Sequence, residues 1–395
     1  MAEITADEKV KPIAFYLPQY HAIPENDREW GAGFTEWVNV KKAKPLFESH
    51  NQPRVPLNDN YYNLLDDSTK IWQSELAQKY GIFGFCYYHY WFKNGKRLLE
   101  KPAEQMLANK KVSIPFCFCW ANENWARNWD GGYANVFVEQ DYGNKDDWEQ
   151  HFDYLLPFFK DERYITFKGM PVFLIYRPEL IDNLEEMLSV FRNRAIKNGF
   201  PGLCIISQFP EWFFLPESDE TLFDYQIEFE PLFSRYYSRF GGVQLRLKKP
   251  YMLLESVHKG LGELLLSAAR GAYGLVKTAK SNTNHLTTLS YERTMQVALS
   301  LNDDSERLLR GIFCGWDNTP RKGVRGAVYE GSNPETFKKF FKKLLPIVSR
   351  RSPHVLFITA WNEWGEGAYL EPDKTYGLGY LKAIKEGLDE FESAK

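Results

Sequence analysis

The sequence predicts a single (β/α)8 barrel over residues 1–395, and two patterns support this fold class. First, eight short apolar runs alternate with amphipathic helical stretches along the chain. Second, these runs are almost continuously apolar, which is typical of a parallel sheet covered on both faces by helices. Eight such units favour a closed barrel that carries insertions. An open doubly wound sheet is the alternative, although no G-x-G-x-x-G turn follows the first strand.

Each predicted strand is one of these apolar runs. They are PIAFYL from residue 12, GIFGFCYY from 81, VSIPFCFCW from 112, MPVFLIY from 170, GLCIIS from 202, FDYQIEF from 223, RGIFCGW from 310 and HVLFITAW from 354. Amphipathic stretches between them predict helices near 67–80, 98–109, 146–160, 179–198, 287–300, 334–348 and 376–392. This order predicts the wall of the barrel and the helical layer around it.

Two long stretches interrupt the alternation. Residues 18–66 connect the first strand to its helix, and residues 230–286 form an insertion after the sixth strand. Between residues 235 and 280 the insertion carries nine basic residues and two glutamates, in a partly amphipathic pattern. Such a segment can rest on an anionic membrane or grip an acidic glycan, and more often it is a solvated helical excursion. Peripheral membrane contact through 235–280 is therefore one hypothesis.

The bulk composition excludes some function classes. A net charge of -3 gives no general attraction to nucleic acid. Aromatic residues make up 16% of the chain and gather in short polar clusters, as expected where flat rings stack on a ligand. The five cysteines lie in apolar strand-like runs, and an odd count without repeated spacing disfavours a disulfide framework. Cys117 and Cys119 read as core residues rather than as a metal pair, so we expect no metal and no cofactor.

The N-terminal residues contain no apolar stretch of the kind that secretory signals carry. No apolar run is long enough to span a bilayer. These features predict a cytoplasmic protein.

The carboxyl ends of the predicted strands carry a concentration of aromatic, carboxylate, amide and imidazole side chains. Loops at these ends form the active site of a (β/α)8 barrel. A sugar ring suits such a surface, because its C–H faces stack on Trp and Tyr while its hydroxyls pair with planar polar groups. The predicted substrate-binding residues are Tyr16, His21, Glu36, Trp37, Tyr88, His89, Tyr90, Trp120, Asn122, Glu123, Trp125, Trp316, Asp317 and Asn362.

Several of these residues also have a purely structural interpretation. Aromatic residues in barrel loops can pack beneath insertions, and His21 and His89 can be buried imidazoles with satisfied hydrogen bonds. Glu123 can form a salt bridge with Arg127, four residues on. The acidic doublets at 66–67, 146–147 and 303–304 lie where helices begin or loops turn, and read as helix caps.

The stretch TAWNEWGEG, residues 359–367, carries two glutamates three residues apart after the last predicted strand. Glu363 and Glu366 can be helix N-terminal residues, where Glu is favourable. They can also be the two carboxyl groups that glycoside cleavage needs, one to protonate the leaving oxygen and the other to act as base or nucleophile. Burial beside Trp361 and Trp364 would raise the pKa of one carboxyl and keep it protonated near neutrality.

The runs AFYLPQYH, GAGFTEWVNVKKAKPLF, GFCYYHYWF, FCFCWANENWARNWDG and AWNEWGEGAYLEPD resemble the WbsX-type family, which is described as glycoside hydrolase family 99-like. The resemblance extends over roughly residues 11 to 390 and weakens in the insertion. It implies a (β/α)8 barrel related to the endo-α-mannosidases. It also implies that Glu363 removes the proton of the sugar 2-hydroxyl and that Glu366 is the general acid/base. Gly365 and the aromatic loops depart from the mannosidase pattern.

The resemblance implies a retaining glycosidase that works through a 1,2-anhydro sugar, on α-mannoside-like or α-rhamnoside linkages of a bacterial surface polysaccharide. One alternative is a glycosyltransferase of O-antigen or polysaccharide biosynthesis that uses an activated sugar donor. Another is a non-catalytic glycan-binding barrel, against which the glutamate pair argues.

Overall fold

The computed structural model describes residues 1–4, 9–126, 136–209, 222–235, 285–300 and 307–395, with isolated positions between 253 and 268. Most of the predicted insertion 230–286, including the basic stretch 235–280, lies outside these residues. Arg127 and the doublet at 303–304 lie outside them as well.

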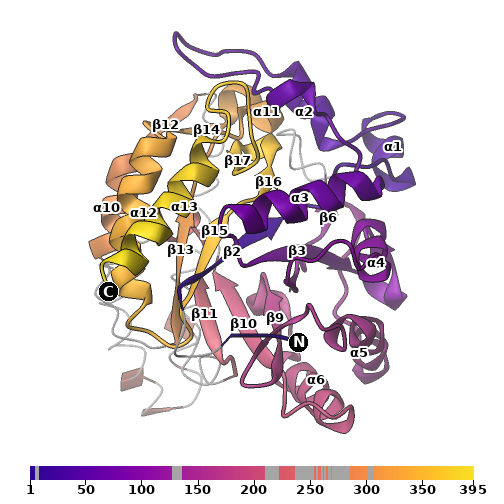
Figure 1. Cartoon of the computed structure of the whole chain (residues 1–395). Coiled ribbons are helices and arrows are strands. Elements are labelled where there is room, and N and C mark those ends of the chain that lie inside the picture. The colour runs from indigo at the N-terminus through magenta and orange to yellow at the C-terminus, as the bar shows by residue number, and fades with distance from the viewer. Residues whose placement is uncertain are drawn as a thin grey trace.

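Eight parallel strands form a closed barrel, as predicted (Figure 1). They are β2 (Lys11–Tyr16), β3 (Gly84–Trp91), β5 (Phe116–Trp120), β9 (Met170–Ile175), β10 (Cys204–Phe209), β11 (Tyr225–Glu228), β13 (Leu308–Phe313) and β15 (Val355–Thr359). The last strand, β15, pairs in parallel with the first, β2, with Phe357 opposite Ile13. This pairing closes the sheet, so the open doubly wound alternative is wrong.

Helices surround the barrel wall (Figure 1). They are α3 (Asp67–Lys79), α4 (Lys101–Ala108), α5 (Lys145–Phe159), α6 (Leu184–Lys197), α10 (Tyr291–Ser300), α12 (Pro334–Val348) and α13 (Gly379–Ser393). Each overlaps a predicted helix. Asp66 is the N-cap residue of α3, and the side chain of Asp147 completes a capping box with Asn144 at the start of α5. The cap interpretation of the doublet at 146–147 is therefore confirmed, whereas Asp66 occupies the N-cap position of α3 without a capping hydrogen bond from its side chain.

The start of the predicted helix 287–300 is wrong. Residues Thr287–Ser290 form strand β12, which pairs in parallel with β14 (Ala327–Glu330), and α10 begins only at Tyr291. Two adjacent β-branched threonines favour an extended backbone, and the partner strand lies far along the chain.

The long connection between β2 and α3 contains helices α1 (Pro24–Trp30) and α2 (Glu36–Lys42). Both lie at the same end of the molecule as α11 (Thr319–Lys322) and as β16 (Asn362–Glu363) and β17 (Ala368–Tyr369), which pair with each other (Figure 1). The short strands β1 (Ala2–Ile4), β4 (Arg97–Leu98), β6 (Trp125–Ala126), β7 (Val136–Val138) and β8 (Ile165–Phe167) complete the described elements. The carboxyl end of the barrel is therefore covered by loops that carry their own secondary structure.

All five cysteines are free and buried, as expected for core residues. Within the described part of the chain, no helix is long and apolar enough to cross a membrane. The cellular location stays a prediction.

Candidate active site

One arginine joins three carboxylates at the carboxyl end of the barrel. Arg321, in α11, places Nε 3.1 Å from Glu36 Oε2, Nη2 2.5 Å from Glu363 Oε1 and Nη1 2.9 Å from Glu366 Oε1. The four side chains come from the loops after the first, seventh and eighth barrel strands. We call Glu36, Arg321, Glu363 and Glu366 the arginine cluster.

The carboxylates of the arginine cluster have different surroundings. Glu36 is fully buried, and its Oε1 makes no hydrogen bond among the described residues. The Glu363 side chain is 9% exposed, whereas that of Glu366 is 21% exposed. Glu366 is thus the carboxylate of the cluster that reaches solvent most readily.

Burial raises the pKa of Glu363 to about 8, although the charge of Arg321 opposes the shift. For Arg321 itself, burial works against the cation, but the three nearby carboxylates raise its pKa above the ordinary value. The arginine therefore stays charged, and Glu363 exchanges its proton closer to neutrality than an exposed glutamate does.

Gly365 has no room for a side chain. A Cβ at this position would lie 2.2 Å from Glu36 Oε2 and 2.9 Å from Arg321 Nε. The glycine between Trp364 and Glu366 thus lets the Glu36–Arg321 pair approach the backbone of the turn. This contact gives a physical reason for one of the two departures from the mannosidase pattern.

Hydrogen bonds hold the turn that carries both glutamates. The Tyr20 hydroxyl donates to Asn362 O at 2.5 Å and accepts from Trp364 N at 3.1 Å. The Trp364 ring stacks on Tyr369 with centroids 3.7 Å apart, and its Nε1 donates to Glu371 at 2.7 Å. The backbone and the ring between the two glutamates are therefore both fixed.

Two predicted substrate-binding asparagines form hydrogen bonds between their side-chain amides and the backbone of a neighbouring loop. Asn362 accepts from Leu17 N at 2.7 Å and donates to Leu17 O at 3.0 Å. Asn122 accepts from Arg177 N at 2.8 Å and donates to Arg177 O at 2.7 Å. Each amide therefore completes the pairing between loops of neighbouring barrel strands, and each contributes to the shape of the site through that pairing.

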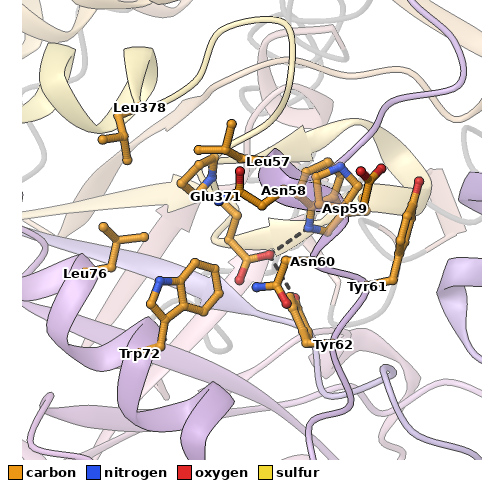
Figure 2. A pocket seen from close by; sticks show the side chains of 13 residues that line it. Leu57, Asn58, Asp59, Asn60, Tyr61, Tyr62, Trp72, Leu76, Glu371 and Leu378 are labelled. Carbon is orange, nitrogen blue, oxygen red and sulfur yellow. Dashed lines mark hydrogen bonds between the residues drawn. The ribbon is translucent and has the colours of Figure 1, made fainter.

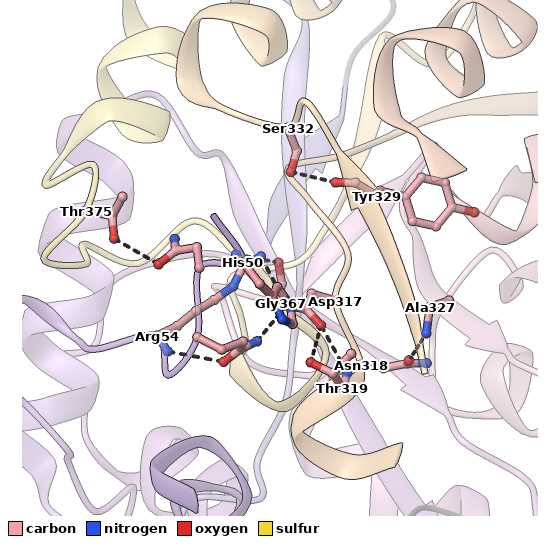
Figure 3. Close-up of polar contacts among 12 residues, drawn as sticks. His50, Arg54, Asp317, Asn318, Thr319, Ala327, Tyr329, Ser332, Gly367 and Thr375 are labelled. Carbon is pink, nitrogen blue, oxygen red and sulfur yellow. Dashed lines mark hydrogen bonds and ion pairs between the residues drawn. The ribbon is translucent and has the colours of Figure 1, made fainter. Parts of the chain in front are cut away.

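Asp317, another predicted substrate-binding residue, is the centre of a buried network (Figure 3). Its carboxylate accepts hydrogen bonds from Gln52 Nε2 at 2.6 Å and from Thr319 N and Oγ1 at 3.1 and 2.6 Å. His50 Nδ1 accepts from a backbone N–H, so a neutral His50 carries its proton on Nε2, 2.9 Å from Asp317. Asp317 N donates to Glu366 O at 2.6 Å. The network therefore fixes the two neighbouring loops that carry Arg321 and Glu366.

The pKa of Asp317 agrees with this role. Burial alone would raise it, but the hydrogen bond from His50, the charge of Arg54 and the other donors hold it at about 2. Asp317 is thus a permanent anion near neutral pH, with its oxygens occupied by protein donors.

Tyr88 and Tyr90, two of the predicted substrate-binding residues, lie within electrostatic reach of Glu363. The Tyr88 ring stacks on Phe15 of β2 with centroids 5.6 Å apart, and the Tyr90 hydroxyl accepts from Gln19 at 3.1 Å. Burial, and to a smaller extent the charge of Glu363, raises the pKa of both tyrosines. Two phenols therefore stand within electrostatic reach of the buried carboxylate.

Three predicted residues face the helical layer instead. Tyr16 donates to Gln73 of α3 at 2.7 Å. His89 Nε2 lies 2.9 Å from His151 Nε2 of α5, and the edge of Trp120 contacts the same His151. The structure does not bring Tyr16, His89 or Trp120 to the arginine cluster, because successive side chains of a strand point to opposite faces.

The remaining predicted residues pack around the loops. Trp37 donates to Tyr62 O at 2.8 Å, Trp125 donates to Asn26 at 3.3 Å, and Trp316 is buried in the core. Glu123 pairs with Arg177 at 2.6 Å. His21 is buried, neither of its ring nitrogens has a hydrogen bond within the described chain, and burial lowers its pKa to about 4.

Sequence reasoning missed Arg321 and Glu371. Arg321 follows the seventh strand in NTPRKG, so its position at a barrel strand end was a usable signal. Several carboxylates in a small buried space also require a cation. No comparable signal marked Glu371, which lies five residues beyond Glu366.

The arginine cluster thus lies at the carboxyl end of a (β/α)8 barrel, where enzymes with this fold carry their active sites. The chain belongs to the family described as Glycosyltransferase WbsX, whose family model matches residues 12–384.

Solved structures with a similar fold include glycosidases. The GH99 endo-α-mannosidase from Bacteroides thetaiotaomicron matches with a TM-score of 0.55 and 14% identity, covering 97% of this chain and 98% of that one. The structure of the GH99 endo-α-mannosidase in complex with bis-tris propane matches with a TM-score of 0.56 and 13% identity. A glycoside hydrolase-like protein matches with a TM-score of 0.53 and 13% identity, covering 98% of this chain and 96% of that one.

Curated relatives include the uncharacterized protein WxcX from two strains of Xanthomonas campestris pv. campestris. They are 34% identical over 379 residues and 33% identical over 385 residues, each over 95% of this chain. The chain spans about half the length of these relatives, at 49%.

Proposed function

We propose that this chain is a retaining glycosidase acting on α-mannoside-like or α-rhamnoside linkages of a bacterial surface polysaccharide. The observation that carries the proposal is that Arg321 holds Glu363 and Glu366 together in different surroundings. A pair of carboxyl groups with different environments can divide acid and base work between them. The fold similarity to an endo-α-mannosidase supports the sugar class.

In the proposed first step, the ionised form of Glu363, which the charge of Arg321 favours against the effect of burial, accepts the proton of the sugar 2-hydroxyl while O2 attacks the anomeric carbon. The glycosidic C–O bond breaks, and Glu366 gives its proton to the leaving oxygen. The product is a 1,2-anhydro sugar. In the second step, Glu366 takes a proton from water and the water oxygen attacks the anomeric carbon. The bond between this carbon and O2 breaks, and Glu363 returns a proton to O2. Two inversions retain the configuration, and both carboxyl groups end as they began.

Arg321 acts in this proposal as a positioning residue. It keeps two carboxyl groups on one side of the sugar and offsets part of their mutual repulsion. Glu36 completes the arrangement by holding the Nε edge of the guanidinium. The other side-chain oxygen of Glu366, Oε2, is left to meet the glycosidic oxygen.

The family description favours a second candidate, a glycosyltransferase in polysaccharide biosynthesis. With an activated sugar donor, the same carboxylate pair would act on an acceptor hydroxyl instead of water. Nucleotide release from GDP-mannose or dTDP-rhamnose that depends on an acceptor glycan, without glycan cleavage, would favour this candidate. Glycan binding without either reaction would favour a non-catalytic barrel.

The test is mass spectrometry of reducing ends released from α-mannosyl and α-rhamnosyl oligosaccharides. We expect cleavage by the wild type, and a loss of about 10²-fold or more in Glu363→Gln and in Glu366→Gln. Glu335→Gln, at the start of α12 and outside the arginine cluster, is the control and should keep full activity. Full activity in both cluster variants would contradict the proposal.

A further inference from the structure

A second hollow lies behind the turn that carries Glu363 and Glu366. It has a volume of about 520 Å³ and opens between residues 56–62, helix α3 and the segment before α13. Figure 2 shows Glu371 near its centre, with Trp72 on one side and Asn60 and Tyr62 on the other. This volume lies within the range of small-molecule sites and accommodates one or two sugar units.

The floor of this pocket is fixed and is shared with the candidate active site. Trp364 lines the pocket, and its Nε1 donates to Glu371 Oε2. The same carboxylate accepts from the Tyr62 hydroxyl at 2.8 Å and from Gln73 Nε2 at 2.7 Å. A ligand in the pocket would therefore rest against a residue that stands between the two proposed catalytic glutamates.

The rim is also held in place by the backbone. Leu57 N donates to Pro372 O, and Lys374 N donates to Val55 O, each at 2.9 Å. These bonds tie the loop after α2 to the segment that follows the glutamate motif. The pocket is therefore preformed, which lowers the entropic cost of binding.

The walls keep several groups available to a ligand. The Trp72 ring is half-buried, so part of its face is open. The side chains of Asn58 and Asn60 are exposed, and their amides make no hydrogen bond among the described residues. The lining contains no basic side chain but two carboxylates, of which Asp59 pairs with Lys374 at 2.8 Å. The lining therefore offers no cation to an anionic ligand such as a phosphate.

We infer that this pocket is a second carbohydrate-binding site, for one or two units of a neutral α-linked glycan. The open Trp72 face stacks on a sugar ring, and the amides of Asn58 and Asn60 bind hydroxyls. The choice of sugar rests on the proposed function, whereas the presence of a neutral sugar site rests on the pocket itself.

The experiment uses 19F NMR of the full chain labelled with 5-fluorotryptophan, in a Glu366→Gln background that blocks turnover. The resonance missing in Trp72→Phe identifies Trp72. Titration with α-mannotriose or α-rhamnotriose should shift this resonance saturably for at least one sugar. Asn60→Ala should weaken that binding about fivefold, the loss of one hydrogen bond, while Asn193→Ala on the exposed face of α6 should not.

A Trp72 resonance that stays unmoved at millimolar concentrations of both sugars would overturn the inference. Unchanged affinity in Asn60→Ala, with the fold intact by thermal unfolding, would also overturn it. The outcome that rejects the proposed function differs from these two. Binding at Trp72 without glycan cleavage by the wild type would reject the glycosidase and keep the pocket.

Discussion

Gly365, in the turn beside the arginine cluster, has no room for a side chain. Its Cα faces Glu36 Oε2 and the guanidinium of Arg321 so closely that no Cβ fits. In the sequence this glycine is only a departure from a related motif. In the structure it is the reason that three carboxylates can share one arginine.

Gly365→Ala should therefore displace the Glu36–Arg321 pair and reduce kcat by about 10²-fold, since small misplacements of catalytic groups have effects of this size. The control is Gly202→Ala, whose Cβ would meet mainly the flexible side chain of Met170. Kinetics of both variants on a cleaved oligosaccharide provide the measurement. Equal activity of the two variants would show that the cluster tolerates a shift, contrary to the account.

At the residue scale, the sequence predicted Glu363, Glu366 and Glu36 but not their common partner. Arg321 lies 42 residues from Glu363 and 285 from Glu36, so the contacts depend on the closed fold. Strand orientation limited the other predictions. Tyr88 and Tyr90 lie near the cluster while His89, between them, contacts α5, and a sequence without known register does not distinguish these faces.

At the element scale, polar side chains at the strand ends hold neighbouring loops together. The amide of Asn362 pairs with Leu17, that of Asn122 pairs with Arg177, and Asn318 Oδ1 accepts from Ala327 N at 2.7 Å. An amide that binds a sugar hydroxyl offers the same donor and acceptor as one that binds the backbone. The sequence therefore placed these residues at the correct end of the barrel without revealing which partner each amide takes.

Asp317→Asn tests the coupling between elements. An amide NH2 in place of either oxygen would face the donors of His50, Gln52 or Thr319, so at least one buried donor loses its acceptor. We expect the free energy of unfolding in urea to fall by about 1–3 kcal/mol. Asp153→Asn, an exposed carboxylate on α5, is the control. Equal stability of the two variants would contradict the central role of Asp317.

At the scale of the whole molecule, the barrel was predictable because eight short apolar runs alternate regularly with amphipathic helical stretches. Closure then brings Leu17 and Asn362 into contact although 345 residues separate them. The site could be predicted only as the set of residues at one end of the barrel. The pairing of β12 with β14 depends on a contact between segments distant in sequence, which the local pattern of either strand does not reveal.

Glu371 makes the stability of the whole fold depend on pH. Burial raises its pKa to about 7, although hydrogen bonds from Trp364, Gln73 and Tyr62 oppose the shift. The folded state therefore binds a proton that the unfolded state releases between the ordinary pKa of Glu and about 7. Its contribution to stability is present below that window and is lost as pH rises through about 7.

The measurement is the free energy of unfolding of wild type and Glu371→Gln at pH 5 and at pH 8. The wild type should lose more stability than the variant between these values, because only the wild type releases this proton. The assignment of a raised pKa to Glu371 would be contradicted if the difference in free energy of unfolding between wild type and variant were the same at both pH values. It would also be contradicted if the wild type gained stability over the variant as pH rises. Glu335→Gln serves again as the control for general buffer effects.

The central claim is that Glu363 and Glu366 divide the work of cleavage, with Glu363 acting on the sugar 2-hydroxyl. The most direct measurement compares turnover of a cleaved α-glycoside with that of its 2-deoxy analogue, which binds without offering that hydroxyl. The account predicts that the analogue is not turned over, although 2-deoxy glycosides are intrinsically the more labile. Turnover of the analogue at or above the rate of the parent glycoside would contradict it.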